Sequence, residues 1–327
     1  MAEQQGIGRK QLIGLFLCSL FVIMYAGPLL RLLPVHASQM GATPSGIGMY
    51  LALVYIGLVG GTLVAGWLSD RYQRKKMMII VAGLIASLSL ALMSQATLLW
   101  QLSLSTVSAW FFGGITYLFF SILAGLSARK DERGKVFGLL AISLPLATLL
   151  AAPVAGVVAD RWGYPTLLAG YAVFALIIPI TTCVLDNPIV APREQASVRD
   201  TLVPQRRQWF SSGCYFLASA IFIMAVVSFA NTLGLSLAMY AQTFSSAQIA
   251  VTVAVGSLVS IPLIYLFGWL SDRFARKRLL AICYLFVGAS TLALAMASAL
   301  WQFWIVSILA ATVIAGTSLS NALTTDL

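Results

Sequence analysis

The sequence contains few charged residues, and most of those are basic. Only 9% of its 327 residues are Asp, Glu, Lys or Arg, whereas soluble domains carry about 25%. Ten acidic residues stand against 20 basic ones, and 60% of the chain is hydrophobic, with a mean hydropathy of +0.93. This composition excludes a soluble domain and indicates an integral membrane protein whose main partner is the lipid bilayer.

Cysteine, histidine and intramembrane acids are also scarce, which argues against several kinds of site. The four cysteines form no C-x-x-C pair, so neither a zinc site nor a disulfide framework is indicated. No Asp or Glu lies within a predicted span, so the residues give proton coupling no support. The single histidine, His36, is expected in a solvated outer loop rather than in a proton relay. We expect no catalytic, metal-binding or cofactor-binding site, and no enzyme.

Long uncharged stretches predict ten membrane-spanning helices of about 20 residues each. One span fits each of the stretches 11–30, 32–69, 136–159 and 162–185, and two fit each of 77–128, 208–271 and 279–325. With the N-terminus inside, 18 of the 20 basic residues are cytoplasmic, and only Arg31 and Arg161 fall outside. Basic residues resist translocation, so the pattern predicts a plasma (inner) membrane protein with a cytoplasmic N-terminus. It also accounts for the positive charge without nucleic acid.

Two halves of the chain repeat each other. The stretch "GWLSDRYQRKK" at 66–76 returns 202 positions later as "GWLSDRFARKR" at 268–278. The same offset aligns "GATPSGIG" (41–48) with "TFSSAQIA" (243–250), and "SQATLLWQ" matches "MASALWQ" one residue off that register. These matches align span 2 with span 8 and span 4 with span 10. Such an alignment predicts parallel repeats related by an axis along the membrane normal. We expect a six-helix bundle at 1–186, a cytoplasmic linker at 187–208 and a four-helix bundle at 209–327.

The repeated stretch resembles motif A of the major facilitator superfamily, G-x-L-x-D-R-x-G-R-[RK], although Gln73 replaces its second glycine. Residues 131–140 resemble the family's loop from span 4 into span 5. Residues 151–165 resemble its span 5 end, where Pro153 and Gly156 form a partial motif C of the antiporter branches. The resemblance implies a twelve-helix transporter fold of a drug-efflux-like branch. The counterpart of 126–186 would lie beyond residue 327, so we expect ten of twelve spans in a fragment or truncated protein.

The resemblance also implies that the repeated stretch gates transport. Expected gating residues are Gly66, Asp70, Arg71, Arg74 and Lys75, with a second copy at Gly268, Asp272, Arg273, Arg276 and Lys277. In the family, the acid latches the two halves in the outward-facing state. Asp70 would then face the start of span 11, and Asp272 the start of span 5 near Gly134 and Lys135. Alternatively, the Arg and Lys residues only fix orientation. For close helix packing we expect Gly57, Gly61, Gly66 and Gly268, together with Pro153 and Gly156 of the partial motif C.

Spans 1, 4, 7 and 10 line the cavity in the resembled family. Candidate lining residues are Tyr25, Arg31, Trp110, Tyr117, Asn231, Trp304 and Asn321. The aromatic ones fit a lipid-facing or interfacial position equally well. A cavity with few charges favours a lipophilic or amphipathic solute. We expect a monomeric secondary transporter, with efflux favoured, that works by rocker-switch alternating access with a coupling ion of unknown identity. The alternatives are a transporter-like receptor or scaffold, or a non-functional truncated product.

Overall fold

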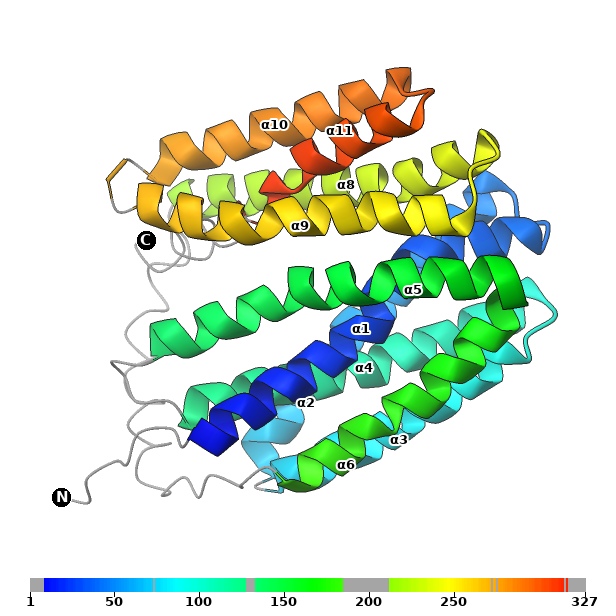
Figure 1. Cartoon of the computed structure of the whole chain (residues 1–327). Coiled ribbons are helices and arrows are strands. Elements are labelled where there is room, and N and C mark those ends of the chain that lie inside the picture. The colour runs from blue at the N-terminus through cyan, green and yellow to red at the C-terminus, as the bar shows by residue number, and fades with distance from the viewer. Residues whose placement is uncertain are drawn as a thin grey trace. The chain divides into compact units, whose positions relative to one another are not determined.

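The computed structural model describes residues 9–72, 74–127, 133–184, 212–271, 273–274, 276–314 and 316. Helices joined by short turns make up these residues, which confirms the all-α prediction (Figure 1). The helices are α1 Arg9–Gln39, α2 Pro44–Arg71, α3 Lys75–Ser94, α4 Leu99–Ser127, α5 Arg133–Ala175, α6 Ile177–Val184, α8 Ser212–Ala241, α9 Ser246–Ser271, α10 Arg276–Met296 and α11 Leu300–Ala310.

Eight of the described helical segments are long and apolar enough to cross a membrane, and the apolar segment Leu300–Ile314 is shorter. One of the eight, Gly138–Cys183, is 46 residues long, about twice what a single crossing needs. Gly163 interrupts it with φ 82° and ψ 165°, a conformation open essentially to glycine alone. The chain turns back there toward α6 (Figure 1). A multi-pass membrane protein is thus confirmed, while the count of ten spans stays a prediction.

Contacts divide the chain into two compact units. The first comprises Met1–Pro188 together with Ser245–Val251, and the second comprises Ile189–Phe244 and Thr252–Leu327. In the first unit α2 packs along α4, α1 along α5, and α3 against α4, α5 and α6. In the second unit α10 packs against α11 and α8. The predicted linker, 187–208, lies outside the described residues.

The sequence repeat extends to backbone conformation. Gly41 before α2 and Thr243 before α9 are 202 positions apart, and both have positive φ, 83° and 65°. A positive φ is uncommon for a β-branched residue such as threonine. Its occurrence at the position that matches a glycine indicates that the turn geometry of the repeat has been kept despite the change of residue.

The helices α4 and α11 also begin alike. Before α4, Gln101 Oε1 accepts hydrogen bonds from the N–H groups of Thr97 and Leu98, at 3.0 and 3.3 Å. Before α11, Gln302 Oε1 accepts from Ser298 and Ala299, at 2.6 and 3.0 Å. Each glutamine satisfies N–H groups of the turn that leads into its own helix. The matching "LWQ" letters therefore reflect a shared local structure.

Close packing of α2 on α4 depends on glycine. A Cβ atom at Gly57 would lie 2.9 Å from the Val107 carbonyl oxygen, and one at Gly61 would overlap the carbonyl group of Phe111. Such backbone approach is the usual role of small residues in membrane helices. The expectation of a close approach at Gly66 is not met, since no described atom lies within 4 Å of a Cβ built there.

Candidate functional site

The first copy of motif A lies where α2 ends and α3 begins. Asp70, Arg71 and Arg74 are exposed, and Lys75 is buried. The Arg71 guanidinium lies over the ring of Trp67, 5.6 Å from its centroid. Arg71 therefore makes a cation–π contact on its own helix, and the Asp70 carboxylate stays exposed at the end of α2.

The second copy reproduces this contact. Arg273 lies 4.0 Å from the ring centroid of Trp269, the counterpart of Trp67. Asp272 lies outside the described residues, and so do the surroundings of Gly268 and the side chains of Arg276 and Lys277. The expected approach of Asp272 to the start of span 5 therefore stays a prediction.

The candidate cavity residues fall into different environments. Tyr25 on α1 and Trp110 on α4 are buried, and the Tyr25 ring lies 6.5 Å from that of Tyr171. Tyr117 and Trp304 are 44% and 37% exposed. Arg31 on α1 is half-buried and interacts electrostatically with Tyr55 on α2. Asn321 lies outside the described residues.

Asn231 joins helices of the second unit. Its side chain is 4% exposed, and its Nδ2 donates to Ser290 Oγ at 2.9 Å and to Thr291 Oγ1 at 3.3 Å. Ser290 Oγ in turn donates to the Val306 carbonyl at 3.0 Å. These bonds connect α8, α10 and α11, so the structure gives Asn231 an interhelical role that the sequence did not reveal.

Replacing Asn231 with leucine is expected to lower stability by about 1 kcal/mol, the usual scale of an interhelical hydrogen bond in a membrane. The loss stays small because Ser290 keeps its bond to Val306. The matched control is Thr232→Val, since Thr232 bonds within α8, to the Ser228 carbonyl. Thermal unfolding midpoints check this, and equal midpoints for the two variants would contradict the interhelical role.

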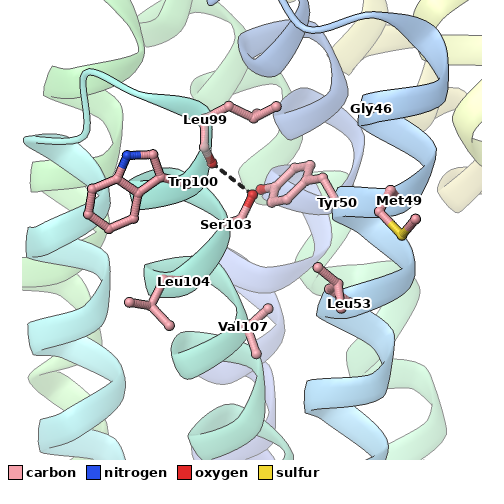
Figure 2. A pocket seen from close by; sticks show the side chains of 9 residues that line it. All are labelled: Gly46, Met49, Tyr50, Leu53, Leu99, Trp100, Ser103, Leu104 and Val107. Atoms are coloured by element: carbon pink, nitrogen blue, oxygen red, sulfur yellow. Dashed lines mark hydrogen bonds between the residues drawn. The ribbon is translucent and has the colours of Figure 1, made fainter.

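A shallow hollow lies between α2 and α4 at one end of the helices (Figure 2). It encloses about 590 Å³ and is lined by Gly46, Met49, Tyr50, Leu53, Leu99, Trp100, Ser103, Leu104 and Val107. Met49 and Trp100 are 67% and 63% exposed. The dashed bond in Figure 2 runs from Ser103 Oγ to the carbonyl of Leu99, within α4. Such an open apolar surface suits hydrocarbon tails of lipid, and none of the candidate cavity residues lines it.

A cluster of polar residues, which we call the α5–α9 contact, was not among the sequence candidates. Asp160 on α5 accepts hydrogen bonds at its two carboxylate oxygens from the N–H groups of Ser246 and Ala247, both at 2.8 Å. Tyr164 Oη lies 3.0 Å from Ser246 Oγ. Gly156, expected from its motif to pack helices, lies against Ala247, and Pro153 is half-buried one turn earlier on α5. All these residues belong to the first unit.

His36 lies beside this cluster, so the expectation that it is in a solvated loop was wrong. It belongs to the last turn of α1 and is 8% exposed. Its ring stacks on that of Tyr164 at 4.6 Å, and its Nδ1 has no hydrogen-bond partner among the described residues. The error arose because Pro34 and the polar letters after it were taken for a loop, whereas α1 continues to Gln39.

Residues 12–327 match the sequence model of the family described as "Major Facilitator Superfamily". The chain belongs to this superfamily. Its sequence is 28% identical over 143 residues to the putative uncharacterized transporter YgaY of Escherichia coli (strain K12), covering 44% of this chain and 35% of that protein. It is 24% identical over 267 residues to the multi-drug resistance efflux pump PmrA of Streptococcus pneumoniae, covering 76% and 64%. The chain thus spans roughly a third to two thirds of these relatives' lengths.

Solved structures share the fold. The nucleoside transporter NupG matches with a TM-score of 0.75 at 13% identity, covering 97% of this chain and 82% of that one. A D-xylose–proton symporter matches with a TM-score of 0.63 at 14% identity, covering 96% and 85%. At such identities the likeness shows the fold alone. The superfamily member is therefore a multi-pass membrane protein with a transporter fold and not an enzyme.

Proposed function

We propose that this protein is a secondary active transporter that exports a small lipophilic or amphipathic solute by rocker-switch alternating access. The superfamily match along residues 12–327 is the observation that supports transport most strongly. The proposal includes ten spans, a cytoplasmic N-terminus and an inner-membrane location, which rest on the distribution of basic residues.

The scarcity of charge along the candidate cavity helices supports a lipophilic solute. Within the described residues 11–39 of α1, 99–127 of α4, 212–241 of α8 and 300–310 of α11, Arg31 and His36 are the ionisable Arg, Lys, His, Asp or Glu residues. A sugar phosphate or a dicarboxylate would need several basic partners, whereas an apolar, aromatic site suits a lipophilic compound. The similarity to PmrA, named a multi-drug resistance efflux pump, favours the outward direction.

Accumulation in cells tests both substrate class and direction. Cells that express the protein are incubated with ethidium, with an uncharged lipophilic dye or with a labelled sugar phosphate, and are compared with cells carrying an empty vector. We expect lower steady-state accumulation of one or both lipophilic compounds and no change for the phosphate. Higher accumulation would contradict export, and a change for the phosphate alone would contradict the proposed substrate class.

A further inference from the structure

Arg31 is a cation inside a membrane-spanning helix. The apolar segment of α1, Gln11–Gln39, has 29 residues and rises about 44 Å, whereas the hydrocarbon core of a bilayer is about 30 Å thick. With α1 centred in the membrane, the core covers about 20 residues, which are roughly 15–35. Arg31 therefore lies within the core, near the edge that the distribution of basic residues predicts to be outer. A charged residue at this depth is costly unless a partner stabilises it.

The side of α1 that carries Arg31 faces other helices of the first unit. Gly27, one turn earlier on the same face, lies against α5, since a Cβ atom built there would be 2.8 Å from Thr148 Oγ1. Arg31 itself interacts electrostatically with Tyr55 on α2. Arg31 and Tyr55 are both half-buried. The neighbouring helices thus shelter the guanidinium from lipid, and its partial exposure leaves it within reach of a small solute.

No carboxylate in the described part of the first unit balances this charge. The acids described there are Asp70 and Asp160. Asp70 is 15 positions beyond Tyr55 on α2, which places it about 22 Å away along the helix axis. Both carboxylate oxygens of Asp160 already accept hydrogen bonds from backbone N–H groups. Within the described residues, the partner of Arg31 is thus a neutral phenol, which cannot neutralise the charge.

An arginine guanidinium selects for the charge and shape of the group that it binds. Its planar set of N–H donors matches the oxygens of a carboxylate or a phosphate, and such charge-assisted bonds are stronger than neutral ones. One cation suits a single negative charge, whereas a sugar phosphate or a dicarboxylate would bring a second charge without a counterpart. The same cation opposes a positive solute, so ethidium is expected to be the poorer of the two lipophilic compounds in the cell assay.

We propose that Arg31 is an anion subsite within the first unit, and that the transported solute is an amphipathic monoanion whose carboxylate or similar group binds there beside Tyr55. The observation that carries this inference is a half-buried cation at membrane depth that no described acid balances. The inference deepens the proposed transport function and rests on it. The phosphate of a lipid headgroup has the same chemistry, so the experiment separates the two sources.

Binding of a matched pair of ligands to the purified full chain tests the subsite. The pair is pyrenebutyrate, an aromatic monoanion at neutral pH, and its uncharged amide, which has nearly the same shape. Saturable binding of each labelled compound is measured in phosphatidylcholine nanodiscs, and the signal of protein-free nanodiscs is subtracted. The variants are Arg31→Gln and Arg31→Lys. The matched control is Arg161→Gln, which removes the other basic residue that the sequence places outside.

The unmodified protein is expected to bind the acid about tenfold or more tightly than the amide. Arg31→Gln should abolish this preference and leave the affinity for the amide unchanged, which also shows that the variant is folded. Arg31→Lys should keep part of the preference, because the charge remains while the planar fork is lost. Arg161→Gln should behave like the unmodified protein.

Three results would overturn the assignment. Equal affinities of the unmodified protein for acid and amide would do so without any variant, and a preference kept in Arg31→Gln would place the anion elsewhere. A preference seen only in lipid-free detergent would assign Arg31 to the phosphate of a lipid headgroup. Because the readout is binding, a protein that binds the acid without moving it would refute the proposed function alone. Transport of a neutral compound without preference for the acid would refute this inference alone.

Discussion

Replacing Gly61 with alanine is expected to prevent the protein from accumulating as a folded, monodisperse species. The added Cβ would overlap the carbonyl group of Phe111 on α4. Backbone cannot move aside as a flexible side chain can, so α2 and α4 would have to separate along their length. Overpacking typically costs about 1–3 kcal/mol, and we expect this backbone overlap to reach or exceed the upper end.

Size-exclusion profiles and thermal midpoints measure the effect. The matched control is Gly66→Ala on the same helix, where no described atom lies within 4 Å of the new Cβ. It is expected to behave like the unmodified protein or slightly better, since alanine favours helix over glycine. Similar behaviour of the two variants would show that α2 and α4 do not meet as closely as the structure has them.

Asp70→Asn is expected to reduce solute flux about tenfold or more while expression and folding are kept. The Asp70 carboxylate at the end of α2 is exposed, so replacing it removes no buried contact and should leave the fold intact. Acids also contribute little to membrane orientation. Its place in motif A is what assigns it a gating contact, either with a basic side chain or with the positive end of a helix.

Flux per folded molecule, compared between Asp70→Asn and Asp70→Glu, checks this role. Glutamate keeps the charge and should restore a substantial part of the flux. Unchanged flux in the asparagine variant would refute the gating proposal for Asp70 and leave motif A with its orienting role only. The exposed position makes loss of stability a poor explanation for any loss of flux.

The sequence predicted the membrane class and the helical fold because each depends on local information. Apolar run lengths indicate membrane crossings, and the paired "GWLSDR" stretches share a local structure, the matching Trp67–Arg71 and Trp269–Arg273 contacts. The predicted break between the spans 136–159 and 162–185 lies within a few residues of the observed turn at Gly163, because it too was predicted from the lengths of the apolar runs. A span needs about 20 residues whatever it packs against.

The α5–α9 contact could not be predicted in this way. Asp160 and Ser246 are 86 positions apart, and nothing in the letters around Asp160 indicates that its partners are backbone N–H groups. The hydrogen bond of Asn231 could not be predicted either, since an asparagine in a span fits a cavity as well as a helix–helix bond until its neighbour, Ser290, is known. The pairing of polar groups is decided by packing, which a single sequence does not display.

Counterflow in proteoliposomes tests the central claim, that this chain moves a solute, most directly. Liposomes holding the purified protein are loaded with an unlabelled lipophilic compound that the cell assay identifies, and labelled compound is added outside. The account predicts transient accumulation of label inside above its equilibrium level, which protein-free liposomes do not show. Saturable binding of label without this overshoot would contradict transport and favour a receptor.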